Sequence, residues 1–536
     1  MSSSTGRRRA GLLIPLFSCP SATSWGIGDI GDIDPVTAWL AGAGQTVLQL
    51  LPLNEMAPGQ QSPYSAISAM AIDPIFISVP RVPEFVSLGG EDALAPADRE
   101  ALDAVRRAPR IQHQAVRRLK RQSLRASFEW FLEREWRRGG DRDRALRAYV
   151  NKQAWWLEDY SLFRALHARE QERPWTQWPE ALQRRDPPAI DRARRDLADE
   201  VLFQQYLQWL AGSQWQQARQ RARARGVALF GDLPFMVDSD SADVWVRQHQ
   251  FRLDLSVGAP PDAFSATGQD WGMPVYQWDA LAAEDYRWLR ERARRSADLF
   301  DGYRVDHLVG FYRTYGRSKD GGDGFFSPAD EGAQRALGET VLRLFRDAGA
   351  EIIAEDLGTV PDFVRASLAR LGIPGYRVFR WERQWHTPDQ PFRDPSDYPP
   401  LSVAASGTHD TEPIAVWWDA APDTERRQVG ELPSVQRLTG GADLSQRPFD
   451  AGIRDILLEI LFGSASQLLT MPVQDAFGWR DRINEPATVS EENWTYRLPW
   501  LVDQLEEIPE ARERKAQLRA WAERYGRALS PASRPG

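Results

Sequence analysis

Acidic residues stand at the ends of several short apolar runs in this sequence, where they could take part in acid–base or nucleophilic chemistry. The acids in these positions are Asp232, Asp306, Glu355, Asp410 and Asp475. A bare carboxylate is very costly to bury, so these side chains are expected to surround one polar site.

Arg304 and Asp306 are two residues apart in an apolar run that reads as a strand, so their side chains face the same side. A guanidinium beside a carboxylate lowers the pKa of the acid by ~1–3 units and keeps it ionised. An ionised carboxylate can act as a nucleophile. The alternative is a plain ion pair that steadies the end of the strand, and the pair by itself does not decide between the two.

Glu355 follows three apolar residues and is expected to lie among other acids. Like charges and partial burial raise the pKa of a carboxyl group, so Glu355 could donate a proton near neutral pH. The alternative is a core glutamate paired with an arginine. His409 and Asp410 add a donor and a further carboxylate. One ionised and one protonated carboxylate are what cleavage of a glycosidic bond with retention requires.

The elements that position these residues are eight short runs rich in Val, Ile and Leu, as expected for buried parallel strands. They lie at 11–17, 46–53, 227–232, 302–306, 351–355, 375–379, 401–406 and 467–473. Stretches with helical periodicity, such as 333–348 and 363–371, separate most of them. This alternation predicts an α/β fold, either a closed (β/α)8 TIM barrel or a doubly wound open sheet. In a barrel, functional residues lie at the C-terminal ends of the strands.

The alternation is interrupted between residues 80 and 225, where the chain is polar, rich in arginine and helical in period. We expect a helical insertion subdomain there, because the segment is too long for a loop. The predicted organisation is a first part of the barrel at 11–79, the insertion at 80–225, the remainder of the barrel with its active-site loops at 226–500, and a C-terminal helix and tail at 501–536.

Composition narrows the possible partners and location. The 536 residues carry a net charge of −8, which does not favour nucleic acid as a partner. One cysteine, Cys19, excludes a disulfide within the chain and indicates a reducing compartment, which we take to be the cytoplasm. The basic and apolar N-terminus imitates an export signal, but its apolar run is short and contains Pro15, so a first buried strand is favoured. No stretch has the length of a membrane helix, and no metal-ligand spacing or cofactor motif is present.

Several motifs resemble the 4-α-glucanotransferases, the amylomaltase or disproportionating-enzyme family (glycoside hydrolase family 77) of the α-amylase clan. The matching segments, in order, are 62–65 (SPYS), 231–235 (GDLPF), 240–245 (DSADVW), 258–264 (GAPPDAF), 267–272 (TGQDWG), 302–307 (GYRVDH), 354–358 (AEDLG), 407–410 (GTHD) and 472–475 (PVQD). The resemblance runs from about residue 11 to residue 500. It implies a TIM barrel with a helical insertion and no separate C-terminal β-domain.

Carried over position by position, the resemblance implies that Asp306 is the nucleophile and Glu355 the general acid and base. Asp410 would hold hydroxyls of the transferred sugar with His409 beside it, and Arg304 would orient Asp306. Further substrate-binding positions are Ser62, Tyr64, Asp232 and His307 around that sugar, and Asp262, Phe264 and Trp271 on the acceptor side. Simple packing is the alternative for Tyr64 and Phe264.

The implied activity is transfer of an α-1,4-glucan segment from a donor glucan to the 4-hydroxyl of glucose or another glucan, with no metal or cofactor. Two alternatives remain: a hydrolase with little transfer, and a glucan-binding protein that has lost the chemistry. Thr411 and Glu412 replace the Asn-Asp that often follows His409 and Asp410 in the family. The preferred chain length is therefore left open, and the sequence does not give the oligomeric state.

Overall fold

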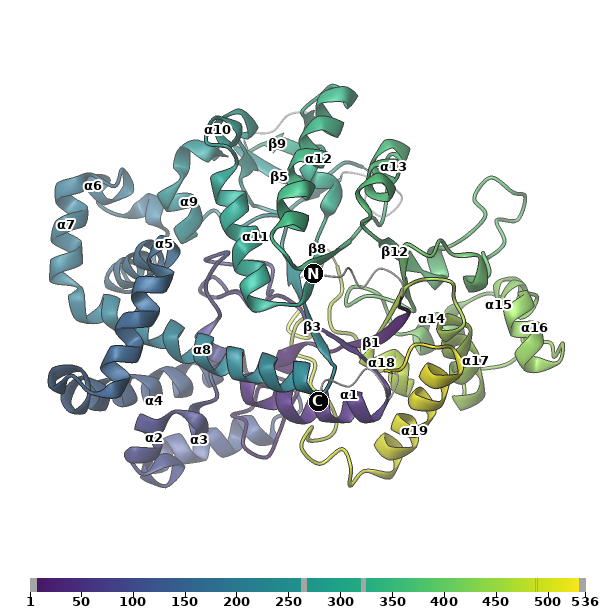
Figure 1. The fold of residues 1–536 in the computed structure, drawn as a ribbon, viewed down its shortest axis with the longest axis horizontal. Helices are drawn as coiled ribbons and strands as arrows, with labels where there is room; N and C mark the ends of the chain where they lie inside the picture. Colours follow the sequence, from purple (N-terminus) through teal and green to yellow (C-terminus); the bar gives the residue numbers. More distant parts are fainter. Residues whose placement is uncertain (1–6, 262–267, 320–323, 487, 489, 530–536) are drawn as a thin grey trace.

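The computed structural model describes residues 7–261, 268–319, 324–486, 488 and 490–529, and its centre is a closed barrel of eight parallel strands (Figure 1). The strands are β1 (Arg9–Leu13), β2 (Val47–Gln49), β3 (Ala228–Leu233), β8 (Gly302–Val305), β11 (Glu351–Ala354), β12 (Gly375–Val378), β13 (Ser402–Ala405) and β14 (Leu468–Pro472). Their order around the barrel is β1-β14-β13-β12-β11-β8-β3-β2. The predicted TIM barrel is confirmed, and the open-sheet alternative is wrong.

Each of the eight apolar runs overlaps a strand of the barrel, because a strand covered on both faces needs apolar residues at successive positions. Every residue of β2, β8, β13 and β14 is buried. The first run was expected to continue to residue 17, but β1 ends at Leu13. Pro15 follows and precedes a short 3-10 helix, Leu16–Ser18, whose residues are buried.

Close packing inside the barrel explains one glycine of β8. A Cβ atom on Gly302 would lie 2.6 Å from a ring carbon of Phe230 on the neighbouring strand β3. Phe230 itself is buried in a cluster with Val47 and Ile353. Gly302 therefore lets a large ring fill the interior next to the strand that carries Arg304 and leads to Asp306.

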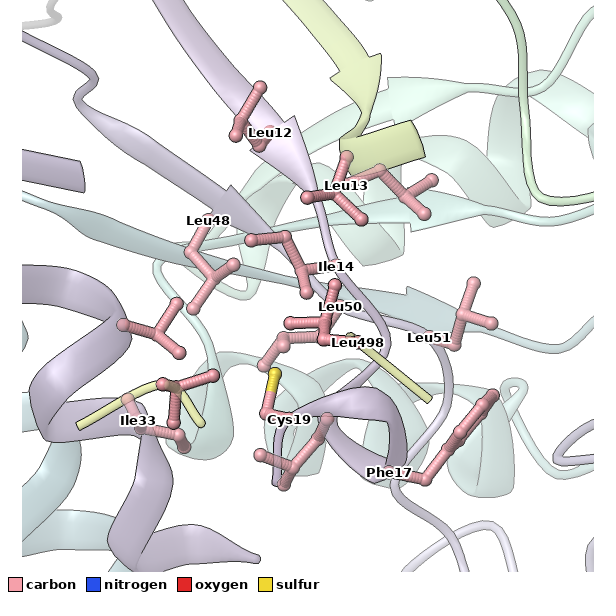
Figure 2. Close-up of a cluster of buried hydrophobic side chains, with 14 of the residues drawn as sticks. Leu12, Leu13, Ile14, Phe17, Cys19, Ile33, Leu48, Leu50, Leu51 and Leu498 are labelled. Atoms are coloured by element: carbon pink, nitrogen blue, oxygen red, sulfur yellow. The ribbon is translucent and has the colours of Figure 1, made fainter. Parts of the chain in front are cut away.

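Helices surround the barrel and bury their apolar faces against it. They include α1 (Ile33–Gly42), α11 (Arg287–Leu299), α12 (Glu331–Asp347), α13 (Asp362–Leu371), α17 (Ala451–Phe462) and α19 (Pro509–Arg524). Figure 2 shows the core beneath the N-terminal strand, where Leu12 and Ile14 lie among Leu48, Leu50 and Ile33. Cys19, the single cysteine, is buried in the same cluster.

The chain between β2 and β3 is mainly helical, and its helices gather at one side of the barrel (Figure 1). They are α2 (Pro83–Ser87), α3 (Pro96–Arg107), α4 (His113–Arg134), α5 (Asp141–Arg169), α6 (Glu180–Gln183), α7 (Pro187–Asp196) and α8 (Ala198–Ala224). Rings of α4 and α8 pack together, as for Phe128 and Tyr206. Farther along α8, the indole of Trp215 donates to the carbonyl of Leu299 at 2.7 Å, so α8 leads from the inserted helices to the barrel wall.

Short strands in the segments after β3 and β8 form two small sheets that the sequence did not predict. One has the order β10-β9-β5-β6, from β5 (Leu255–Ala259), β6 (Gln269–Asp270), β9 (Thr314–Ser318) and β10 (Phe325–Ser327). The other pairs β4 (Phe251–Arg252) with β7 (Val275–Tyr276). Trp271 follows β6, and its backbone N–H donates to Val257 of β5 at 2.9 Å.

Further helices follow the later strands: α9 (Ala242–Val246), α10 (Trp278–Ala283), α14 (Ile414–Ala420), α15 (Asp423–Gly430), α16 (Pro433–Thr439) and α18 (Val473–Phe477). After β14, the described part of the chain contains helices and loops but no strand. None of the described helices is long and apolar enough to span a membrane.

Candidate active site

Three neighbouring strands, β3, β8 and β11, bring a set of charged side chains to one end of the barrel. The register of β3 and β8 places Asp232 opposite Arg304. The register of β8 and β11 places Ala354 opposite Val305, and Glu355 and Asp306 are the next residues of the two strands. The N–H of Glu355 donates to the carbonyl of Val305 at 3.1 Å, which extends this ladder by one bond. Asp306 and Glu355 therefore lie side by side, directly after the ends of two neighbouring strands.

Arg304 is the centre of the charged cluster, and its side chain is only 6% exposed. Its Nη1 donates to both carboxylate oxygens of Asp232, at 2.9 and 2.7 Å. Its Nη2 lies 2.7 Å from Asp306 Oδ1 and 3.9 Å from Glu355 Oε2. Burial alone would lower the pKa of the guanidinium, but the charges of Asp232 and Asp306 outweigh burial and raise it well above its ordinary value. The guanidinium is therefore a fixed positive charge between the acids.

The two carboxyl oxygens that face Arg304 Nη2 cannot lie farther apart than the sum of their distances to that nitrogen, 2.7 and 3.9 Å. Two carboxyl groups about 5–5.5 Å apart are typical of glycosidases that retain anomeric configuration. Asp306 and Glu355 are thus close enough for that type of chemistry.

Glu355 and Asp306 have different electrostatic surroundings. Burial, reinforced by the charge of Asp306, raises the pKa of Glu355 to about 7 against the opposing effects of Arg304 and the N–H of His307. Glu355 can therefore carry a proton near neutral pH. Asp306 forms the shorter contact with Arg304, and its side chain is 24% exposed. Arg304 therefore contacts Asp306 directly and lies farther from Glu355.

His307 connects the strand of Asp306 with the carboxyl group of Glu355. Its backbone is left-handed, with φ at 40°, and its N–H donates to Glu355 Oε2 at 2.8 Å. A non-glycine residue in this conformation costs about 1–3 kcal/mol, and such strain is typical of functional sites. Burial lowers the pKa of the imidazole to about 4, so the ring is neutral. Its ring centre lies 4.7 Å from that of Trp271, in an edge-to-face arrangement.

Tyr64 closes the opposite side of the cluster. Its hydroxyl donates to Asp232 Oδ2 at 2.8 Å and lies 3.0 Å from His409 Nε2, and its ring stacks on that imidazole. Burial raises the pKa of Asp232 to about 6 despite the nearby charge of Arg304. The hydroxyl of Tyr64 thus has a polar role in the cluster in addition to the packing of its ring.

Asp410 follows β13, and its side chain is 40% exposed. Its Oδ2 lies 3.2 Å from His409 Nε2, and its Oδ1 accepts from Asn484 Nδ2 at 2.7 Å. Burial alone would raise the pKa of Asp410, but His409 and Asn484 outweigh it and lower the pKa to about 2. Arg482 donates to the backbone carbonyl of Asp410 at 2.8 Å. The result is an ionised, oriented and partly exposed carboxylate.

Asn484 and Arg482 were not predicted from the sequence. They lie in a loop after α18, far along the chain from Asp410, and no local pattern distinguishes them from other polar loop residues. Their role becomes visible only when the loop is folded against β13.

Some predicted residues lie elsewhere. The expectation that all five strand-end acids surround one site is wrong for Asp475, which accepts from the Ser406 hydroxyl at 2.6 Å and the Ile414 N–H at 2.7 Å in a buried network of its own. Ser62 accepts from the N–H of Tyr64 at 3.3 Å and supports that loop. Asp262 and Phe264 lie outside the described residues.

Within the described part of the chain, no three His, Cys, Asp or Glu side chains gather as a metal site.

Comparison with known proteins gives consistent matches along the chain. The family model described as 4-alpha-glucanotransferase matches residues 14–503. The 4-alpha-glucanotransferase of Chlamydia pneumoniae is 33% identical over 492 residues, which are 91% of each protein. That of Thermus thermophilus is 31% identical over 96% of this chain and 98% of its own length. The structure of amylomaltase from Streptococcus agalactiae in complex with acarbose superposes with a TM-score of 0.81 at 25% identity, covering 98% of this chain and 100% of that one.

Proposed function

The chain belongs to the 4-alpha-glucanotransferase family and is a glycosyl-transferring enzyme that acts on α-glucans; from this premise we propose that Asp306 and Glu355 perform the transfer by double displacement. The observation that carries this assignment is the placement of both carboxyl groups against one nitrogen of Arg304, at 2.7 and 3.9 Å. The unequal contacts match unequal roles, an ionised nucleophile and a protonated acid.

In the first step, a carboxylate oxygen of Asp306 attacks the anomeric carbon of an α-1,4-linked glucose unit. The bond to the glycosidic oxygen breaks, and that oxygen takes the proton of Glu355 and leaves with the reducing-end part of the glucan. The remaining segment is held as an ester of Asp306.

In the second step, Glu355 is the base. It removes the proton from the 4-hydroxyl of glucose or another glucan, and that oxygen attacks the anomeric carbon and displaces Asp306. The two inversions give net retention, and the proton that Glu355 gave to the leaving group is replaced by the proton of the acceptor hydroxyl. The donor is an α-1,4-glucan segment and the acceptor is glucose or a maltooligosaccharide.

The other polar side chains of the cluster either bind the sugar that is transferred or position the groups that do the chemistry. We assign Asp410 to grip ring hydroxyls, because it is ionised and partly exposed, while His409 and Asn484 fix its orientation. Asp232 and Tyr64 hold Arg304 on the side away from Asp306. Arg304 is thereby fixed at the position where its other terminal nitrogen contacts Asp306.

Transfer competes with hydrolysis, since water could replace the acceptor hydroxyl in the second step. The ring of Trp271 contacts the ring of His307, which directly follows Asp306 in the chain. The indole of Trp271 is therefore next to the reacting groups. We assign it to the acceptor side, where an aromatic ring favours a sugar over water. Asp262 and Phe264 are assigned to the same side on family resemblance.

Incubation with maltotriose tests the proposed function. Transfer gives a ladder of longer maltooligosaccharides together with free glucose, whereas hydrolysis gives only maltose and glucose. We expect the ladder, and we expect it to disappear in the Asp306→Asn variant. Maltose and glucose alone would instead support the hydrolase, and no products at all would support the glucan-binding protein without chemistry.

We place the enzyme in the cytoplasm. This proposal is supported by the use of one cysteine in 536 residues, which is typical of proteins that need no disulfide. Cys19 is 2% exposed and packs as a core residue.

A further inference from the structure

A pocket of about 630 Å³ shares no residue with the cluster around Arg304. One part of its lining is residues 106–110, at the C-terminal end of α3. The other part is Trp479, Asp481 and residues 496–501, which lie after α18, and Pro20 completes the lining. None of these residues has a role in the transfer reaction described above.

The charged side chains of the pocket are strongly unbalanced. Four arginines line it, namely Arg106, Arg107, Arg110 and Arg497, against the single carboxylate Asp481. Two of the arginines are neutralised from outside the lining, Arg106 by Glu91 at 2.7 Å and Arg110 by Glu492 at 3.2 Å. The pocket therefore keeps a positive excess that comes from Arg107 and Arg497.

Arg497 is held in place without being neutralised. Its Nη1 donates to the carbonyl oxygens of Arg106 and Ala108, both at 2.7 Å, which fixes the side chain at the end of α3. Burial lowers the pKa of its guanidinium, which shows that the charge is only partly solvated. Within the described residues, neither Arg497 nor Arg107 forms an ion pair with a carboxylate. A partly buried guanidinium with spare donors is suited to a phosphate, whose oxygens match its planar fork.

The same pocket contains two tryptophans, Trp479 and Trp500. Trp479 stacks on Phe477 with ring centres 4.5 Å apart. Trp500 packs edge to face against Trp479, with ring centres 5.2 Å apart. The two indoles are thus held rigidly by their neighbours. Flat aromatic surfaces are suited to the C–H faces of a sugar ring.

We propose that this pocket binds a hexose that carries a phosphate monoester, with the phosphate on Arg107 and Arg497 and the sugar ring against the tryptophans. This ligand differs from the neutral glucans of the transfer reaction. The phosphate has two sources with the same chemistry, a free hexose phosphate and a phosphorylated glucose unit within a glucan chain.

The pocket is connected to the reaction site through the backbone. Asp481 precedes Arg482, which holds the carbonyl of Asp410, and Trp494 donates to the carbonyl of Ile483 at 2.8 Å. A ligand in the pocket therefore contacts the segments that orient Asp410.

Calorimetric titration of the full chain tests the proposal, using the Asp306→Asn variant so that glucans are not consumed. The probes are glucose 6-phosphate, glucose, inorganic phosphate, maltotetraose, and maltotetraose phosphorylated at a 6-hydroxyl. We expect glucose 6-phosphate to bind saturably and more tightly than glucose or inorganic phosphate. Arg107→Gln should weaken this binding by about tenfold, the loss expected for charge-assisted hydrogen bonds.

The matched control is Arg99→Gln, which removes the same charge from the same helix α3 outside the pocket lining. It should leave glucose 6-phosphate binding unchanged. Arg497→Gln should weaken binding at least as much as Arg107→Gln, and Arg497→Lys should restore part of it if the helix end is intact. Tighter binding of the phosphorylated chain than of glucose 6-phosphate would identify a glucan as the source, and weaker binding would identify a free sugar phosphate.

The proposal is overturned if glucose 6-phosphate does not bind, if Arg107→Gln and Arg99→Gln behave alike, or if inorganic phosphate binds as tightly as glucose 6-phosphate. The proposed transfer function is tested separately, because Arg107→Gln in the otherwise unchanged enzyme should still give the maltotriose ladder. Failure of one proposal therefore does not hide failure of the other.

Discussion

The backbone N–H of His307 donates to Glu355 Oε2 at 2.8 Å, across the junction of β8 and β11. His307 reaches this position by adopting a left-handed conformation with φ at 40° directly after Asp306. The turn that follows Asp306, the proposed nucleophile, thus also holds the carboxyl group of Glu355, the proposed acid. One left-handed residue therefore links the positions of the two proposed catalytic groups.

The pH dependence of transfer should show an alkaline limb. Burial raises the pKa of Glu355 to about 7, and the first step needs its protonated form. Below pH 7 the proton is present, and above pH 7 it is lost, so kcat/KM should fall about tenfold for each pH unit well above 7. Maltosyl fluoride does not need a proton on its leaving group, so the limb should be absent when fluoride release is measured. An unchanged limb with the fluoride would show that another group titrates.

Arg304→Met should impair both folding and activity. The change leaves the carboxylate of Asp232, whose side chain is fully buried, without its cation. Breaking a buried ion pair from one side costs about 3–5 kcal/mol in the free energy of unfolding, which urea titration measures. Adding Asp232→Asn should recover part of that stability and none of the activity. Equal stability of Arg304→Met and the parent enzyme would mean that the pair is not needed to satisfy Asp232.

The strands of the barrel could be predicted because each is an unbroken apolar run, a pattern that burial on both faces imposes locally. The sheets formed by β4 to β7, β9 and β10 could not. These strands have two to five residues and depend on pairing with distant segments, as Leu255 does with Ser318. Their own residues carry too little periodicity to identify them.

The acids of the site were predictable in the same way, because they terminate those runs at the end where a barrel places its functional groups. What each acid does there depends on contacts that the sequence does not show. Asp475 satisfies a buried N–H of Ile414, whereas Asp410 is oriented by Asn484 from a separate loop. The position of an acid at the end of a strand does not show which of these two roles it has.

Asn484→Ala should lower kcat/KM about tenfold, because it removes a hydrogen bond that orients the carboxylate of Asp410, the group that we propose grips the transferred sugar. The matched control is Asn493→Ala, since the side chain of Asn493 bonds to Glu485 and Thr488 of the same segment and, within the described residues, not to Asp410. Steady-state kinetics with maltotriose compares the two. Similar losses in both variants would show that loop stability, and not the contact with Asp410, is responsible.

His167 should contribute stability that depends on pH. It is fully buried, with Nδ1 2.8 Å from Glu172 and Nε2 2.8 Å from Asp240, and it ties α5 to the segment after β3. Burial alone would lower its pKa, but the bonds to Asp240 and Glu172 outweigh burial and raise it.

A raised histidine pKa stabilises the folded state fully below the unfolded value of about 6.5, and the stabilisation is lost as pH rises through the folded value. His167→Gln should therefore lower Tm more at pH 5.5 than at pH 9.5, as measured by calorimetry. A Tm difference that is equal at both pH values would mean that the pKa of the imidazole is not raised in the folded protein.

The covalent intermediate gives the most direct test of the reaction assigned to Asp306 and Glu355. In the Glu355→Gln variant, maltosyl fluoride should react in the first step, since fluoride leaves without a proton, and the second step should be slow for want of a base. Mass spectrometry of the quenched and digested protein should then find one added maltosyl group on the peptide that contains Asp306. A maltosyl group on another residue, or none while fluoride is still released, would contradict the account.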